Sequence, residues 1–452
     1  SKNENIETED KTDIKSIIDN DNIPVLGMFR NNEQELARDL SKLIGDLSKG
    51  KEVKLKVRKI LDKEYFESIN SQNQDKLMES RKRSAEKAKK AGRISLKLDS
   101  ENGSLGDMAV LTFSPKESFQ GHHMFPLFLK KNLERLKEPI SIFNPKGQDF
   151  QSIKEVSILC GLILECIDPE SKIQKSNTKI PKLALRYMKK WRKIAKEFID
   201  SSPEPHNPIS LADFVTRWQL RQAYPSSEKW PKKASLLELT YKLASWIQEF
   251  QDDVEGLIYL ESITKTISQN GFFNEYSANI YFDSYENEVA SIEEAIWNIF
   301  IPIATGGVKL EESSFETLPP NRLNIMSIHQ SKGLEFPLVI VDVGSRFDKN
   351  KISDSNLRFP KKSDNSSNLE DKIRSYSSLG KSDRNSCDRS FDDLTRLYFV
   401  AFSRAQEVLL LIGLTKGLEG YKSKDTYLNI PNVALGWNRD NEFKGFDELY
   451  LI

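Results

Sequence analysis

Two stretches of the sequence carry residue types that are suited to chemistry. The first reads NIMSIHQSKGLEFPLVIVDV over residues 324–343, and the second reads DDLTRLYFVAFSRAQEVLLLI over residues 392–412. The first sets His329, Gly333 and Glu335 between two apolar runs, and the second places Arg404 directly before an apolar run. An imidazole, a carboxylate and a guanidinium are groups that bind charged and polar ligands through strong hydrogen bonds. These two stretches are therefore the candidate functional segments of the sequence.

The apolar runs on either side of HQSKGLEF in the first stretch, residues 323–328 and 338–343, are typical of buried strands. In an open parallel sheet, ligands bind in the crevice at the carboxyl ends of the strands. We therefore expect His329, Gly333 and Glu335 to lie where a ligand binds. A second interpretation stays open, in which Glu335 is a helix-start carboxylate that the helix dipole favours.

In the second stretch, residues 392–405 have the apolar spacing of a helix, and an apolar strand begins at residue 408. Arg404 is thus predicted where the helix ends and the sheet begins. A packed arginine at that place can reach out of its own domain toward an anion. The alternative is that Arg404 satisfies the free carbonyl groups at the end of its own helix.

The rest of the chain shows where these stretches belong. The first 21 residues are too polar to order themselves, and residues 22–170 mix strand and helix patterns, with strands expected at 23–28, 93–98, 108–112 and 140–143. Helices are expected at 33–47, across the charged segment 51–93, and at 153–166. Residues 171–318 read as consecutive amphipathic helices, and the α/β pattern returns over 319–452. The predicted fold is an α/β domain interrupted by an all-helical insertion.

Composition limits the possible partners and compartments. The 452 residues carry 67 Lys+Arg and 67 Asp+Glu, so any nucleic-acid contact must come from local patches. The basic segment 81–93 favours a solvated helix face or a flexible insertion over a phosphate contact, whereas the basic segment 185–198 fits a solvated surface and a nucleic-acid contact equally well. Three cysteines without zinc-type spacing predict a reducing, cytoplasmic compartment and no metal site. No apolar run reaches the ~20 residues that span a bilayer, so we expect no membrane segment.

The two stretches together resemble a known family. SIHQSKGLEF is similar to motif V, and DDLTRLYFVAFSRAQ to motif VI, of the UvrD/Rep-type superfamily-1 DNA helicases. GDMAVLTF and IFNPKGQDFQSIKEV resemble two further segments of the family's second RecA-like domain, and the helices that follow resemble its insertion, domain 2B. The resemblance covers roughly residues 22–415 and implies a RecA-like parallel sheet domain interrupted by an all-helical insertion domain.

The resemblance implies a role for each candidate residue. In such helicases ATP and Mg²⁺ lie between two RecA-like domains. Glu335 would contact the ribose, Arg404 would be the arginine finger, and Gly333 would let backbone N–H groups approach the phosphates. Ser327 and His329 would contact the DNA strand along which the protein moves. The implied activity is ATP-dependent unwinding of 3′ to 5′ polarity on single-stranded and duplex DNA, with DNA repair as one of several possible pathways.

The sequence also departs from the family. No GxxxxGK(S/T) phosphate loop occurs, and the nearest segment, SYSSLGKS at 375–382, lacks the first glycine. The first RecA-like domain, which would hold most of the Mg²⁺ site, is missing. We therefore expect the chain alone to be inactive and to need such a domain, either in a longer protein or in another polypeptide.

Two further interpretations remain. The first is a non-catalytic DNA-binding or scaffold subunit derived from a helicase. The second is a helicase fused to a nuclease, which we disfavour because only about 40 residues follow the last expected strand.

Overall fold

The computed structural model describes residues 25–70, 73–99, 101–177, 179–226, 228–310, 318–344, 376, 386–418, 433–437 and 443–452. The chain forms two compact units. The sheet unit comprises residues 1–144 together with 319–452, and the helical unit comprises residues 145–318. Most of the segment SYSSLGKS, most of the polar stretch 345–390, and the tail 1–21 lie outside the described residues.

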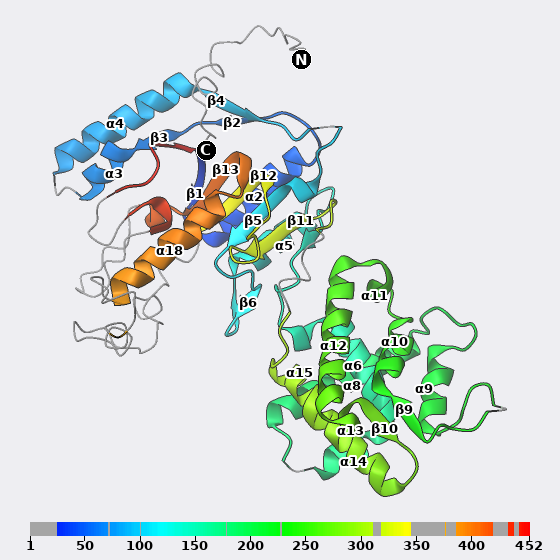
Figure 1. Cartoon of the computed structure of the whole chain (residues 1–452). Coiled ribbons are helices and arrows are strands. Elements are labelled where there is room, and N and C mark those ends of the chain that lie inside the picture. The colour runs from blue at the N-terminus through cyan, green and yellow to red at the C-terminus, as the bar shows by residue number, and fades with distance from the viewer. Residues whose placement is uncertain are drawn as a thin grey trace. The chain divides into compact units, whose positions relative to one another are not determined.

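The described part of the sheet unit is built on one eight-stranded sheet of order β3-β14-β1-β13-β12-β5-β11-β8 (Figure 1). Neighbouring strands are parallel except β14 and β3. The strands are β1 (Val25–Arg30), β3 (Lys59–Asp62), β5 (Met108–Thr112), β8 (Ile142–Phe143), β11 (Leu323–Ser327), β12 (Phe336–Gly344), β13 (Ala405–Leu414) and β14 (Glu448–Leu451). A mostly parallel sheet with connecting helices confirms the predicted RecA-like architecture.

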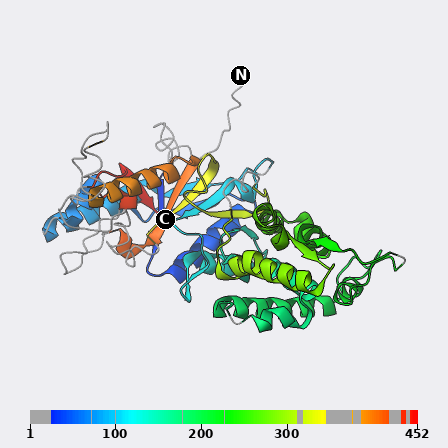
Figure 2. The same cartoon turned by 60° about the horizontal axis from the view of Figure 1, so that its bottom comes forward.

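Helices cover both faces of this sheet (Figure 2). On one face α2 (Glu33–Leu47) and α5 (Phe125–Glu134) bury their apolar sides against the strands, and α18 (Ser386–Phe402) lies on the other. The α2 boundaries match the predicted helix 33–47. Its apolar residues recur at three- and four-residue steps, and the Asn32 side chain caps it by accepting from the Glu35 N–H at 2.8 Å.

The segment 51–93 differs from the single long helix that we predicted. It contains β2 (Val53–Lys56), β3, α3 (Lys63–Asn70) and α4 (Gln74–Ala91). Strand β2 pairs antiparallel with β4 (Arg93–Leu96), and β3 joins the main sheet beside β14. The helix prediction was wrong over residues 53–62, because strand partners far away in the sequence decide the conformation of this charged stretch.

The helical unit is organised around α6 (Lys154–Ile167), which is apolar on nearly every side and is buried. Contacts with α8, α9, α10 and α12 surround it, and the shared core includes Trp191 and Phe250. The other helices are α7 (Lys172–Ser176), α8 (Lys182–Asp200), α9 (Leu211–Gln219), α10 (Leu236–Ala244), α11 (Glu249–Asp252), α12 (Val254–Phe273), α13 (Glu275–Ala278), α14 (Tyr285–Ala295) and α15 (Ile301–Thr305). A short antiparallel pair that we did not predict, β9 (Lys233–Ser235) and β10 (Asn279–Tyr281), accompanies them.

The boundary of the helical unit differs from the predicted one. We expected residues 22–170 to belong to the first part of the sheet domain, but the compact helical unit begins at Pro145. The reason is α6 itself: a helix that is apolar all round must be enclosed, and the helices of this unit enclose it. Residues 171–318 lie within the helical unit, and residues 319–452 lie within the sheet unit.

Candidate functional site

The segment 328–335 runs from the carboxyl ends of the strands back to their amino ends. It follows β11, whose last residue, Ser327, is level with Thr112 at the carboxyl end of β5. It leads into β12, where Leu338 is level with Met108 at the amino end of β5. Two parallel strands that follow each other in the chain require such a return. We name residues 328–335 the return segment.

Backbone turns and buried polar contacts hold the return segment. The Ser331 N–H donates to the Ser327 carbonyl at 3.2 Å, and the Leu334 N–H donates to the Ser331 carbonyl at 3.0 Å. The buried Ser331 hydroxyl donates to the Ile328 carbonyl at 2.9 Å. Gly333 has a φ of +88°, and a Cβ placed there would meet nothing within 4 Å. Gly333 is therefore needed for its left-handed backbone rather than for close approach of a neighbouring atom.

Glu335 and Arg404 lie side by side at the amino ends of two neighbouring strands. Each comes immediately before a strand, Glu335 before β12 and Arg404 before β13, and Phe336 and Ala405 are paired in the sheet. The Phe336 N–H donates to the Arg404 carbonyl at 2.9 Å. The Gln406 side-chain amide donates to Glu335 Oε2 at 3.2 Å. Glu335 is exposed, whereas Arg404 is half-buried.

The Arg404 guanidinium is fixed by three hydrogen bonds. Its Nε donates to the Val400 carbonyl at 3.1 Å, its Nη1 to the Leu334 carbonyl at 3.1 Å, and its Nη2 to the Ser403 hydroxyl at 3.0 Å. The bond to Val400 is the carbonyl contact that the alternative interpretation of Arg404 predicted. A guanidinium has five N–H donors, so these contacts with described residues leave two donors for another acceptor.

The helix before Arg404, α18, contacts β12 and β13. Tyr398 lies on α18, where burial raises the pKa of its hydroxyl above the usual range and the nearby Asp342 carboxylate at the end of β12 acts in the same direction. Ala401 is fully buried at the end of the helix. Arg404 therefore follows a helix that is anchored on the sheet rather than a loose loop.

Ser327 and His329 lie at the carboxyl ends of the strands, whereas Glu335 lies at their amino ends. The Ser327 hydroxyl accepts from the Gln330 N–H at 3.3 Å, and the Gln330 side-chain oxygen accepts from the Ser327 N–H at 2.8 Å. His329 is exposed in the turn that follows. The structure thus brings Glu335 and Arg404 together and separates them from Ser327 and His329 by the length of the return segment.

This arrangement corrects one expectation. We predicted that His329, Gly333 and Glu335 would all lie at the carboxyl ends of strands. That holds for His329, which follows the carboxyl end of β11, but Glu335 lies at the amino end of β12, and Gly333 precedes it by two residues. The prediction assumed that the whole stretch was one ligand loop, whereas its two ends serve opposite edges of the sheet. The contact between Gln406 and Glu335 was also missed, although Gln406 is only two residues from Arg404.

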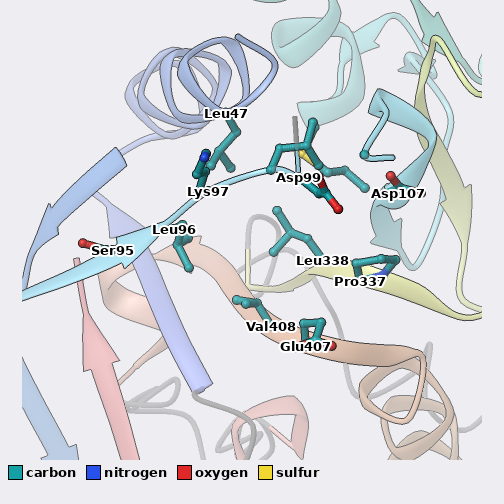
Figure 3. A pocket seen from close by; sticks show the side chains of 13 residues that line it. Leu47, Ser95, Leu96, Lys97, Asp99, Asp107, Pro337, Leu338, Glu407 and Val408 are labelled. Carbon is teal, nitrogen blue, oxygen red and sulfur yellow. The ribbon is translucent and has the colours of Figure 1, made fainter. Parts of the chain in front are cut away.

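A cavity of about 410 Å³ opens beside the amino ends of β5, β12 and β13 (Figure 3). Leu338 and Val408 contribute to its apolar floor, and Lys97, Asp99 and Glu407 contribute polar groups. Glu335 and Arg404 are not among its lining residues. The candidate pair therefore lies outside this cavity.

Two other kinds of feature are absent from the part of the chain that the structure describes. The described residues hold no group of three or more His, Cys, Asp or Glu side chains that could bind a metal ion. None of the described helices is both long enough and apolar enough to cross a membrane.

Comparison with known proteins places the chain in a family. Residues 20–416 match the model of the UvrD-like helicase C-terminal domain. A protein of Clostridium perfringens (strain 13 / Type A), named as an ATP-dependent helicase/nuclease subunit, is 33% identical over 129 residues, which are 26% of this chain and 10% of that protein. A protein of the same name from Exiguobacterium sibiricum is 37% identical over 102 residues, 22% of this chain and 8% of that protein.

These relatives are much longer than the region they share with the chain, which spans about a tenth of their length. The family model, in contrast, covers most of the 452 residues. The chain therefore belongs to the UvrD-like helicase C-terminal domain family.

Proposed function

We propose that this chain is the C-terminal portion of an ATP-dependent DNA helicase and completes an ATP site that a first RecA-like domain mainly holds. The observation that carries the proposal is that Glu335 and Arg404 lie next to each other, each immediately before one of the paired strands β12 and β13. An exposed carboxylate and a half-buried guanidinium with donors to spare suit a nucleotide, whose ribose presents hydroxyl groups and whose phosphates are anionic.

In this proposal Arg404 is the arginine finger. Phosphoryl transfer spreads negative charge over the γ-phosphoryl oxygens, and a positioned guanidinium stabilises that charge with little reorganisation. The bonds from Arg404 to Leu334 and Val400 provide such positioning. Glu335 would accept from the ribose hydroxyl groups, and the backbone near Gly333 would lie beside the phosphates.

Mg²⁺ would be held mainly by the first RecA-like domain. The described residues offer one carboxylate at the pair, Glu335, and no cluster of metal-ligating side chains. Octahedral Mg²⁺ in phosphoryl-transfer sites is bound by one or two carboxylates together with phosphate oxygens. The sequence also lacks a phosphate loop. We therefore propose that the chain alone does not hydrolyse ATP.

Ser327 and His329 would contact single-stranded DNA at the other edge of the sheet. A hydroxyl and an exposed imidazole can both donate to phosphate oxygens without reading the base sequence. The helical unit would act on duplex DNA as the domains close and open around ATP. The 3′ to 5′ polarity that the UvrD/Rep resemblance implies is part of the proposal.

The test mixes this chain with a polypeptide that carries a phosphate-loop RecA-like domain and measures DNA-stimulated ATP hydrolysis. Arg404→Lys keeps the charge but loses the planar fork, so we expect the rate to fall by about 10³-fold or more. Arg396→Lys is the matched control, because Arg396 is an exposed arginine on α18, the helix that ends just before Arg404, and the rate should not change. An unchanged rate for Arg404→Lys would assign Arg404 to structure alone.

The same measurements separate the alternatives. A mixture that binds DNA and never hydrolyses ATP would favour a non-catalytic DNA-binding or scaffold subunit. Robust hydrolysis by the chain alone that is lost in Arg404→Ala would overturn the shared site.

The relatives' name joins a nuclease to a helicase, which favours a parent assembly with both activities. We place this chain in the helicase part. The measurement is DNA cleavage by the assembly without ATP. Cleavage that persists in Arg404→Ala would agree with that placement, and cleavage that Arg404→Ala abolishes would contradict it.

A further inference from the structure

The connection between β5 and α5, residues 113–124, carries two exposed phenylalanines. The exposed fraction is 66% for Phe113 and 52% for Phe119. Exposing large apolar rings to water is unfavourable, and such rings often mark a binding surface. The connection follows the carboxyl end of a central strand, which is the edge where open α/β sheets bind ligands (Figure 1).

Phe113 lies next to the proposed DNA contacts. It directly follows Thr112, which is paired with Ser327 across the sheet. The Ile328 N–H donates to the Thr112 carbonyl at 3.1 Å, so the backbones of the two segments remain joined at the point where Phe113 begins. Ser327 and Phe113 therefore both lie at the carboxyl ends of the paired strands β5 and β11.

The rest of the connection is held in place. The buried Asn144 amide donates to the Pro115 carbonyl at 2.9 Å, and the Met124 N–H donates to the Glu117 carbonyl at 3.0 Å. Glu117, which is nearly buried, pairs with Lys130 of α5 at 2.9 Å. Rings on a fixed frame lose little conformational entropy when a ligand binds.

The tip of the connection is a short hairpin that carries the second ring. Strands β6 (Ser118–Phe119) and β7 (His122–His123) pair antiparallel, and Phe119 is opposite His122. Both histidines are exposed. With His329 on the neighbouring return segment, three of the chain's four histidines follow the carboxyl ends of β5 and β11. Aromatic faces beside hydrogen-bond donors are the combination that binds single-stranded nucleic acid without sequence preference.

We propose that Phe113 and Phe119 are base-stacking contacts for single-stranded DNA whose backbone passes Ser327 and His329. The inference rests on the proposed function, because it takes the DNA strand to lie at this edge. It adds the part of the ligand that is recognised: the aromatic faces of the bases bind the β5–α5 connection, while the phosphates bind the return segment.

The experiment compares two ligands of equal length and charge on the full chain. Fluorescence anisotropy measures the Kd for an oligothymidylate and for an abasic oligonucleotide, which keeps the phosphates and lacks the bases. Phe113→Leu and Phe119→Leu keep an apolar side chain and remove the ring. Each should weaken oligothymidylate binding by about fivefold or more and leave the Kd for the abasic ligand unchanged. Phe113→Trp, which keeps an aromatic ring, should bind oligothymidylate as tightly as the wild type.

Control variants test the stacking of Phe113 and Phe119 separately from the DNA contacts of Ser327 and His329. Phe399→Ala removes an exposed ring on α18, whose exposed fraction is 71%, and should not change either Kd. Ser327→Ala together with His329→Ala should weaken both ligands alike. If these two substitutions weaken binding but the ring variants do not, the inference fails and the proposed function stands. If the wild-type chain binds neither ligand, both fail. Equal losses for the two ligands in the ring variants would also contradict stacking.

Discussion

Arg404 holds Leu334 through a hydrogen bond from its guanidinium to the Leu334 carbonyl at 3.1 Å. The backbone carbonyl of Arg404 also accepts from the Phe336 N–H at 2.9 Å. Glu335 lies between these two contact points, so one residue fixes the backbone on both sides of the proposed ribose-binding carboxylate. Only the first of the two bonds involves the side chain. Replacing Arg404 therefore removes the guanidinium while it leaves the pairing of β12 with β13.

From this relationship we predict that Arg404→Ala is only moderately destabilising. The substitution loses three hydrogen bonds from a half-buried cation, which corresponds to about 1–2 kcal/mol because the freed carbonyls can bind water. Hydrogen exchange of the amides in β12 and β13 should be faster by the factor that corresponds to this free-energy loss. Arg396→Ala should leave the exchange unchanged. Exchange as slow as in the wild type would mean that these three bonds are absent in solution.

A second prediction concerns Gly333. Its φ of +88° is unfavourable for a residue with a Cβ, and the space around it is open, so Gly333→Ala should cost about 1–2 kcal/mol through backbone strain alone. Gly333→Asn should cost less, since asparagine tolerates the left-handed region better. Hydrogen exchange of residues 331–336 measures the effect.

Gly121 provides the matched control for this prediction. It has a φ of +80° and equally open surroundings, but it lies in the β6–β7 hairpin. Gly121→Ala should give a similar local loss, confined to the hairpin. A Gly333→Ala protein with unchanged exchange would contradict the left-handed conformation of the return segment.

The local pattern of the sequence was enough to predict many elements of the fold. Helix 33–47, strand 108–112 and the strand beginning at 323 were predicted to within one residue of their observed bounds, because each has a clear hydrophobic pattern. The strands at 53–62 could not be found in this way. Residues 59–62 pair with β14, which is almost 400 positions later, and a charged sequence shows nothing of that partner. A strand that depends on a distant partner is decided by tertiary contacts.

The geometry of the candidate residues could not be predicted from the sequence. Glu335 and Arg404 were both chosen from the sequence, and each immediately precedes one of two paired strands. The edge at which Glu335 lies was assigned incorrectly, because strand order is needed to see that the return segment crosses β5. Phe113 could have been found, since it follows the correctly predicted end of a central strand.

A third prediction concerns pH and the group formed by Asp62, Lys87 and Glu448. Lys87 of α4 contacts Asp62 at 3.0 Å and Glu448 of β14 at 2.8 Å. The bond to Glu448 is the main cause that raises the pKa of Lys87 above 10.5. Burial alone would raise the pKa of Asp62, but bonds from the Tyr65 N–H and from Lys87 outweigh it and hold the pKa below 3.8.

These two pKa shifts make the stability of the protein depend on pH in two separate ranges. The Asp62 contribution is present above the unfolded pKa and is lost as the pH falls below about 3.8, and the Lys87 contribution is lost as the pH rises above about 10.5. Lys87→Met should therefore lower the free energy of unfolding by about 0.5–1 kcal/mol at pH 7 and by less at pH 2.5. Urea unfolding at the two pH values measures the difference. Lys63→Met, which removes an exposed pair with Glu67, should have almost no effect, and an equal loss at both pH values for Lys87→Met would contradict the assignment.

The fourth prediction concerns the buried charges of the helical unit. Arg192 of α8 donates to Glu165 at 3.2 Å, to Asp168 at 3.3 Å and to the Gln174 side-chain oxygen at 3.2 Å, and all four side chains are nearly inaccessible. The Asp168 carboxylate also accepts from the Ile173 and Gln174 N–H groups, each at 3.0 Å, so it fixes the turn after α6. This cluster joins α6, α7 and α8 around the core.

Arg192→Met should destabilise the helical unit by about 3–5 kcal/mol, because it leaves the buried Asp168 carboxylate without the Arg192 cation and leaves Glu165 with only the exposed Lys196 ammonium at 3.8 Å. Arg192→Lys should be intermediate, since one ammonium cannot bond all three side chains that the guanidinium fork contacts. Urea unfolding followed by tryptophan fluorescence is a suitable measurement, as Trp191 is fully buried beside Arg192. Lys193→Met is the control on the same helix, because its pair with Glu197 is exposed, and it should cost under about 0.5 kcal/mol. If Arg192→Met unfolds at the same urea concentration as the control, the carboxylates must find other partners, and the cluster does not stabilise the fold.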